Sequence, residues 1–172
     1  EILRSDWSSD VCSSDLDNSV HLDATLASSM NALSPGVFTT IKPLYRDGVY
    51  YFHFRNNQGL ESKKQFNAID ERLQSNLRVG MSNGLIVGFG NLDTPAHFYA
   101  YDLQCPNCFD IDALPQRNYE LTVTGTGIAT CKTCHRSYNL NTGGNIVSGE
   151  RGKTMTRYRA STTGPNGVLH VY

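Results

Sequence analysis

The sequence predicts an all-β domain, an antiparallel β-sandwich or small barrel with one short inserted helix. Short runs of β-branched and aromatic residues recur along the chain, and turn dipeptides such as Pro35-Gly36 and Asp47-Gly48 separate them. The 15 glycines and 9 tyrosines among 172 residues fit short strands joined by tight turns. Residues 62–77 depart from this pattern.

The first predicted strands precede that stretch. Residues 20–26 alternate weakly between apolar and polar side chains, and residues 37–41 (VFTTI) follow a Pro-Gly turn. The Asp47-Gly48 dipeptide is typical of a tight hairpin, and the run VYYFHF at residues 49–54 follows it directly. These patterns predict a strand over each of the three ranges.

Residues 62–77 are predicted to form the inserted helix. Apolar side chains recur there at spacings of three and four residues, as on one face of a helix, and Ser62 with Gln65 resembles a capping box. The apolar face consists of Phe66, Ile69, Leu73 and Leu77. We expect it to pack against the core of the domain rather than to bind a partner.

The β pattern returns at Gly84 and continues to the end of the chain. Residues 85–89 (LIVGF) form a continuous apolar run that is typical of a buried strand. Short strands at this spacing, with glycine-rich connections, favour an antiparallel sandwich or a small barrel. The later strands are expected at residues 98–103, 119–128, 137–140, 145–147, 155–160 and 168–172.

Residues 4–16 (RSDWSSDVCSSDL) fit neither the strand pattern nor the helix pattern. The segment resembles the conceptual translation of a sequencing adapter, so residues 1–16 are interpreted as an adapter-derived, disordered artefact and are excluded from the fold. Residues 17–172 are then expected to form a single domain. The native N-terminus, with any secretion or lipoprotein signal, is expected to lie upstream of Asp17.

Composition narrows the range of functions. The net charge is -1 and only 18% of residues are charged, so no basic stripe indicates nucleic acid as a partner. No apolar run in the visible chain approaches the roughly 20 residues that a transmembrane helix needs. The sequence also lacks G-x-S-x-G, H-E-x-x-H and glycine-rich phosphate-loop motifs, which favours a non-catalytic protein.

Excluding Cys12 leaves four cysteines in two C-x-x-C pairs. Cys105 and Cys108 form the first pair, Cys131 and Cys134 form the second, and 22 residues separate them, enough for a strand out and a strand back. A tight turn in each pair would place both sulfurs on one side, and two facing pairs supply four thiolates in a roughly tetrahedral array. Soft thiolates select Zn²⁺, Fe or an iron–sulfur cluster over hard cations.

Metal-binding loops are therefore predicted at residues 105–108 and 131–134, although two other chemistries stay open. Two disulfides would form if the protein is exported to an oxidising compartment. A thioredoxin-like redox motif would need a pair between a strand and a helix, and neither pair precedes a predicted helix. The spacing favours the metal site over both alternatives.

From Gly84 onward the chain resembles a Rieske-type domain. GLIVGFGNLDTPAHFYAYDLQCPNC is similar to the strand, turn, strand and first cluster loop of that family, and CKTCHRSYNLNTGGNIVSG is similar to its second loop and hairpin. MTRYRA and GVLHVY are similar to the closing strands. The resemblance covers about half of the chain and implies a Rieske-like fold. The order of the segments along the whole chain is also similar to that of Rieske-like envelope lipoproteins of Bacteroidetes.

The resemblance assigns roles to residues and also has departures. It implies that Cys105 and Cys131 are the two cysteine ligands of the family. Cys134 stands where the second histidine ligand would be, and Asn107, one place before Cys108, stands at the first histidine position. The site is therefore expected to contain only cysteine ligands. Four thiolates would give a [2Fe–2S] cluster a much lower reduction potential than the two-histidine ligation of the Rieske family does.

Two further residues are candidate cofactor contacts. Tyr138 matches an aromatic position that hydrogen-bonds a cysteine sulfur in some family members. His135 is a candidate extra ligand or hydrogen-bond donor, or else a loop histidine with an unusual backbone angle.

The expected function is a non-catalytic structural or binding role, with four thiolates holding one structural Zn²⁺ (or Fe) ion. The alternative is a [2Fe–2S] electron-transfer protein. The resemblance implies a bacterial cell-envelope or periplasmic lipoprotein with a lipid anchor upstream, and an unknown protein partner.

Overall fold

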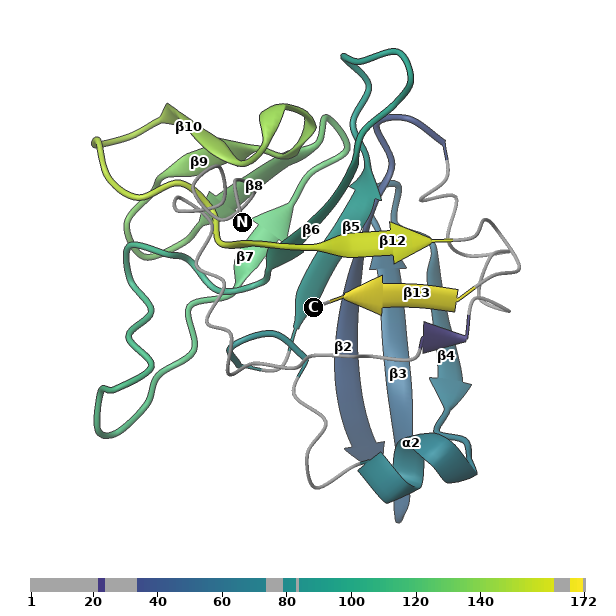
Figure 1. Cartoon of the computed structure of the whole chain (residues 1–172). Coiled ribbons are helices and arrows are strands. Elements are labelled where there is room, and N and C mark those ends of the chain that lie inside the picture. Colours follow the sequence, from purple (N-terminus) through teal and green to yellow (C-terminus); the bar gives the residue numbers. More distant parts are fainter. Residues whose placement is uncertain (1–21, 24–33, 74–78, 83, 163–167, 172) are drawn as a thin grey trace, which may run out of the picture.

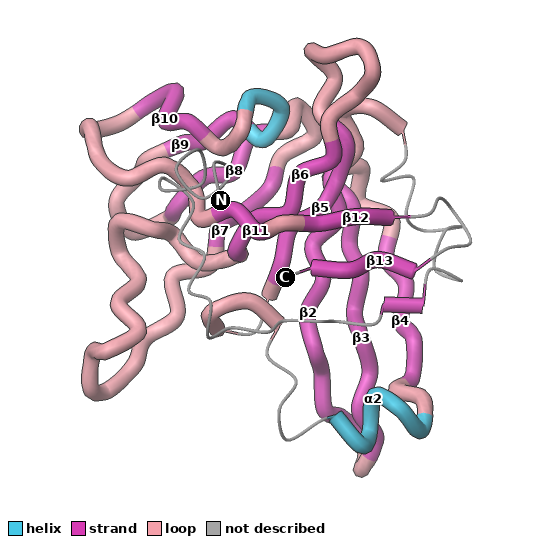
Figure 2. Tube along the Cα trace, viewed as in Figure 1, coloured by secondary structure: helices cyan, strands magenta, loops and turns pink. Residues whose placement is uncertain are grey.

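The computed structural model describes residues 22–23, 34–73, 79–82, 84–162 and 168–171. In this part of the chain nearly all regular structure is β, in three antiparallel sheets, as Figures 1 and 2 show. The all-β prediction is confirmed. None of the three sheets closes on itself within the described ranges, so the arrangement is a layered sandwich rather than a barrel.

The central sheet has six strands in the order β11-β6-β5-β2-β3-β4. Its first hairpin turns at Asp47 and Gly48, which both have positive φ, 53° and 81°, as the dipeptide predicts. The strands are β2 (Phe38–Arg46), β3 (Val49–Asn56), β4 (Glu61–Gln65), β5 (Leu85–Phe89), β6 (Phe98–Asp102) and β11 (Arg157–Tyr158).

Two smaller sheets cover the central one. The four-stranded sheet has the order β10-β9-β8-β7, and the three-stranded sheet has the order β1-β13-β12. Their strands are β1 (Leu22–Asp23), β7 (Leu121–Val123), β8 (Ile128–Cys131), β9 (Ser137–Asn139), β10 (Asn145–Ser148), β12 (Ala160–Thr162) and β13 (Val168–Val171), with a 3₁₀ turn η3 at Leu140–Thr142.

The central sheet is buried on both faces, which explains the continuous apolar run of β5. Leu85 and Val87 belong to one core, here called the first core, while Ile86 between them belongs to the second core. The first core contains Ile41, Phe52, Phe54, Phe66, Val79, Leu85, Val87, Ala100, Leu169 and Val171. The second core contains Phe38, Ile86, Tyr99, Tyr101, Leu103, Cys105, Leu121, Ala129, Cys131, Tyr138, Leu140 and Met155.

The predicted helix is present but shorter than the sequence pattern indicated. Helix α2 spans Ala68–Leu73, whereas Ser62 lies in strand β4 and pairs with Phe54. The capping box is therefore wrong: hydrogen bonding to the neighbouring strand decides the conformation of residues 61–65. Residues 74–78 lie outside the described ranges.

The predicted strand over residues 119–128 is two strands. Hydrogen bonds from Gly127 N to Thr124 O, 3.0 Å, and from Thr124 N to Ile128 O, 2.9 Å, close a tight turn between β7 and β8. Gly127 has φ of 76°, and a Cβ there would lie 2.5 Å from Asn141 Nδ2. The chain thus runs out and back between the two cysteine pairs, as their separation predicts.

Other predicted strands differ mainly in length. The range 37–41 is extended into β2, and the range 155–160 is divided between β11 and β12. Residues 1–16, which the sequence analysis excluded, lie outside the described ranges.

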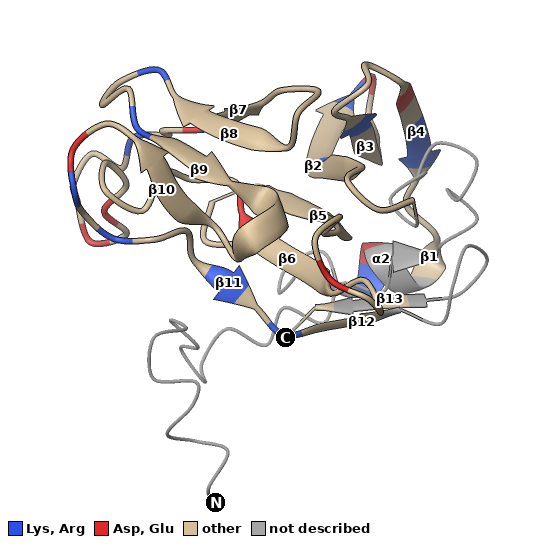
Figure 3. Cartoon of the chain, turned by 90° about the horizontal axis from the view of Figure 1, so that it is seen from above, with Lys and Arg blue, Asp and Glu red and all other residues tan. Residues whose placement is uncertain are grey.

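Positions of basic and acidic residues are intermixed along the described ribbon rather than gathered by sign (Figure 3). One ion pair, between Lys42 Nζ and Glu120 Oε2 at 2.8 Å, connects the central sheet to the segment that enters β7. This mixture agrees with the near-zero net charge.

Candidate metal centre

The first cysteine pair lies in a tight turn after β6. Cys105 N donates to Tyr119 O at 2.8 Å, so the chain still pairs as in a sheet when it reaches Cys105. Cys105 O then accepts hydrogen bonds from Cys108 N at 3.2 Å and Phe109 N at 2.9 Å. This turn brings the Cys105 and Cys108 side chains to one side of the loop.

The second pair lies between β8 and β9. Cys131 is the last residue of β8, and its carbonyl accepts a hydrogen bond from His135 N at 3.0 Å. Cys131 N donates to Arg136 O at 2.9 Å, which closes the turn from the other side. His135 has φ of 58°, the left-handed conformation that non-glycine residues adopt rarely.

The two turns bring all four sulfurs together. The Sγ atoms of Cys105, Cys108, Cys131 and Cys134 lie within 4.8 Å of one another. The Sγ–Sγ distance is 3.7 Å between Cys105 and Cys134 and 3.9 Å between Cys108 and Cys131. All four are free thiols. The predicted convergence of the four cysteines is therefore observed.

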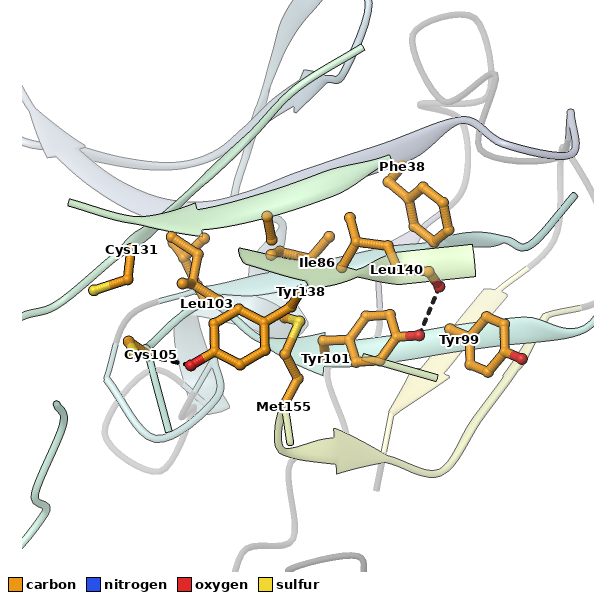
Figure 4. Packing of buried hydrophobic residues seen from close by; sticks show 12 residues of the cluster. Phe38, Ile86, Tyr99, Tyr101, Leu103, Cys105, Cys131, Tyr138, Leu140 and Met155 are labelled. Carbon is orange, nitrogen blue, oxygen red and sulfur yellow. Dashed lines mark hydrogen bonds between the residues drawn. The ribbon is translucent and has the colours of Figure 1, made fainter. Parts of the chain in front are cut away.

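The four sulfurs differ in exposure. Cys105 and Cys131 are buried at one end of the second core, beside Leu103 and Tyr138 (Figure 4). Cys108 and Cys134 are half-buried, and Cys108 lines a surface pocket of about 270 Å³ with Leu114, Arg117 and Tyr119 among its other lining residues. One sulfur of each pair thus lies inside the fold and one near solvent.

Arg136 promotes ionisation of the Cys134 thiol. Burial alone would raise the pKa of Cys134. Hydrogen bonds from the Arg136 backbone N–H and guanidinium, together with those from the Cys108 and Cys105 thiols, outweigh burial and lower the pKa to about 6. Burial raises the pKa of Cys105 and of Cys108. The lowered pKa favours the thiolate form of Cys134, which is the form that binds a metal ion.

The Tyr138 hydroxyl lies 3.3 Å from Cys105 Sγ (Figure 4). Burial, together with the hydrogen bond to Cys105, raises the pKa of Tyr138, so the phenol stays protonated. His135 is exposed in the turn after Cys134, and the group of converging ligand atoms contains only cysteine sulfurs. A metal contact from His135 stays a prediction.

A third segment lies at the site, residues 150–153, here called the strap, and no sequence pattern predicted it there. Arg136 Nε donates to Glu150 O at 3.0 Å, and Arg136 Nη2 donates to Arg151 O at 3.3 Å. Asn107 bonds both the N–H and the carbonyl of Lys153, each at 2.8 Å. The sequence offered only the glycines at 149 and 152 as a sign of this segment. Glycines indicate a turn, but they do not indicate which residues the turn contacts.

No family model, curated protein or solved structure matches this chain. The assignment therefore rests on the residues: an all-β fold presents a cluster of four cysteines at metal-binding distance. Within the described part of the chain, no helix has the length and apolar character needed to cross a membrane.

Proposed function

We propose that this domain binds one structural Zn²⁺ or Fe ion through Cys105, Cys108, Cys131 and Cys134. The observation that best supports this proposal is the spacing of the four sulfurs. A tetrahedral ion with metal–sulfur bonds of about 2.3 Å holds its sulfurs about 3.8 Å apart. The Cys105–Cys134 and Cys108–Cys131 distances between sulfurs, 3.7 and 3.9 Å, lie on either side of that value.

Ligand chemistry supports a structural role. Four protein thiolates complete a tetrahedral coordination shell, which leaves no open position for water or substrate. Structural sites of this kind contribute their binding free energy to folding, because the ligands do not converge in the unfolded chain. We infer that the ion holds the two cysteine turns together and fixes the four-stranded sheet against the central sheet.

A [2Fe–2S] electron-transfer centre is the second candidate. The contact between the Tyr138 hydroxyl and Cys105 Sγ favours it, because the resemblance to Rieske-type domains implies that contact. The spacing disfavours it, because thiolates on different irons are separated by the iron–iron distance as well as by their bonds. All four sulfurs lie within 4.8 Å of one another, which is better suited to one ion.

The resemblance also supports a proposal about scaffold and location. We infer a Rieske-like scaffold in a bacterial envelope lipoprotein, with the lipid-bearing cysteine upstream of Asp17. Fractionation of cells that produce the native gene product tests this location. The protein should sediment with membranes and be released by detergent, and recovery in the soluble cytosolic fraction would contradict it.

Elemental analysis with an absorption spectrum tests the metal assignment. Chain beginning near Asp17, purified without added metal, should contain one metal ion per chain and release no sulfide on acidification. A colourless sample with zinc supports a zinc site. A coloured sample that releases sulfide would establish the cluster instead, and metal-free protein without free thiols would establish two disulfides.

A further inference from the structure

The orientation of the Asn107 side-chain amide is fixed by the strap. Asn107 Oδ1 accepts a hydrogen bond from Lys153 N, which can only donate, and Nδ2 donates to Lys153 O, which can only accept, both at 2.8 Å. Rotating the amide by half a turn would set donor against donor and acceptor against acceptor. The nitrogen of Asn107 therefore faces the Tyr138 hydroxyl, 2.8 Å away.

This orientation sets the direction of the next hydrogen bond. An amide nitrogen only donates, so the Tyr138 oxygen must accept from Asn107 Nδ2. The hydroxyl proton of Tyr138 is then free to point elsewhere, and Cys105 Sγ lies 3.3 Å from that oxygen. The chain of donors runs from the Asn107 amide to the Tyr138 hydroxyl and then to the Cys105 sulfur.

We propose that Asn107 is a positioning residue for the metal site, which aims the Tyr138 hydroxyl proton at the Cys105 sulfur and couples the strap to that ligand. This inference rests on the proposed metal-binding function. A donated hydrogen bond withdraws electron density from a thiolate and fixes its orientation, and contacts of this kind around metal ligands affect metal affinity about 10- to 100-fold.

Close packing supports the coupling. Gly152 lies directly against the Asn107 side chain, and a Cβ at position 152 would lie 2.3 Å from Asn107 Oδ1. The strap can therefore approach the amide only because residue 152 has no side chain. Asn107 is half-buried, and its side chain hydrogen-bonds both Tyr138 and the strap, where its partner Lys153 lies 46 positions away in the sequence.

Asn107→Asp tests the direction of the proton, because a carboxylate oxygen in place of Nδ2 would accept from Tyr138 instead of donating. Tyr138→Phe removes the hydroxyl directly. In Co²⁺-loaded protein, each variant should shift the sulfur-to-cobalt charge-transfer band to longer wavelength, because the Cys105 sulfur loses its hydrogen bond. Each should also weaken Zn²⁺ binding by about 10- to 100-fold.

Lys153→Gln is the matched control for charge. It changes the local charge by the same amount as Asn107→Asp, but Lys153 contacts Asn107 through backbone atoms alone. Its charge-transfer band should stay at the wild-type position. The double variant Asn107→Asp with Tyr138→Phe should show no larger band shift than Tyr138→Phe alone.

Three results for the charge-transfer band would overturn the inference. The band of Asn107→Asp could shift no further than that of Lys153→Gln, or the band of Tyr138→Phe could stay at the wild-type position. The third result is a shift in the double variant that equals the sum of the two single shifts. If Asn107→Asp fails to fold, wild-type protein loaded with a spin-half cadmium isotope gives a second test. A scalar coupling between the Tyr138 hydroxyl proton and cadmium is expected, and its absence would refute the inference. Failure of wild-type protein to bind Co²⁺ would instead refute the metal site itself.

Discussion

Cys131 is the residue whose replacement tests the site with least ambiguity. It is buried, ends strand β8 and belongs to the converging group of sulfurs. Cys131→Ser should lower Zn²⁺ affinity by more than the roughly 10- to 100-fold expected for residues outside the ligand set, since it removes a ligand. It should also lower the melting temperature of the zinc-loaded protein.

In the full 172-residue chain, Cys12→Ser is the control for that experiment, because Cys12 lies outside both C-x-x-C pairs. Metal content and melting temperature should match those of the wild type, as measured by elemental analysis and calorimetry. Equal loss of metal in the two variants would mean that the four paired cysteines are not the ligand set.

Asp102 is a buried carboxyl that holds the segment before β5. Oδ2 accepts from Met81 N at 2.6 Å and from the Tyr158 hydroxyl at 2.7 Å, and Oδ1 accepts from Gln104 N at 2.8 Å. Burial raises the pKa of Asp102, although these three hydrogen bonds oppose the shift. Through the bond from Gln104 N, the Asp102 side chain also stabilises the connection between β6 and Cys105.

Asp102→Asn should therefore destabilise the protein in a pH-dependent way. The amide sets an N–H donor against one of these donors, at a cost of about 1–3 kcal/mol. Because the pKa of Asp102 is higher in the folded protein than in the unfolded chain, the carboxyl group contributes its full stabilisation only below the unfolded pKa of about 4. That stabilisation is lost as pH rises through the pKa of the folded state. The cost should shrink as pH rises above the unfolded pKa of about 4, as measured by urea unfolding with saturating zinc. A cost that grows with pH would contradict the raised pKa.

At the scale of elements, β5 separates the two cores and offers a matched pair of variants. Leu85 and Ile86 are adjacent and fully buried, but Leu85 faces the first core and Ile86 faces the second core, which contains Cys105 and Cys131. Leu85→Ala and Ile86→Ala should each cost about 2–5 kcal/mol. Only Ile86→Ala should also weaken zinc binding, as measured by competition with a chelator. Equal zinc affinity in the two variants would show that the second core does not support the metal site.

Elements with apolar periodicity were the ones that the sequence predicted best. The LIVGF run became β5 with the expected limits, Leu85–Phe89, because burial on both faces leaves a continuous apolar pattern. Strand β4 was missed because its residues, ESKKQ, carry no apolar alternation, and pairing with β3 decides its conformation. The turn inside residues 119–128 was missed because threonine and glycine fit both a strand and a tight turn.

The same reasoning applies to the candidate site. The C-x-x-C spacing is local, so the sequence alone predicted which sulfurs converge. The contact of Asn107 with Lys153 joins residues that are 46 positions apart, and an asparagine in a loop carries no pattern that reveals its partner. Contacts of this kind depend on how the sheets pack, which is a property of the whole fold.

At the scale of the molecule, metal removal should loosen one side of the sandwich. Cys105 and Cys131 belong to the second core, while the first core lies on the opposite face of the central sheet. After chelation, amide hydrogen exchange should accelerate first in β7 to β10 and in both cysteine turns. Strands β2 and β3 should keep their protection longer. Unchanged exchange around both turns would contradict a structural role for the ion.

X-ray absorption at the metal edge tests most directly whether four thiolates share one ion. We expect a single shell of four sulfur atoms at about 2.3 Å from the metal and no scattering from a second metal atom. A shell with fewer than four sulfurs, or a metal–metal distance in the spectrum, would contradict the account.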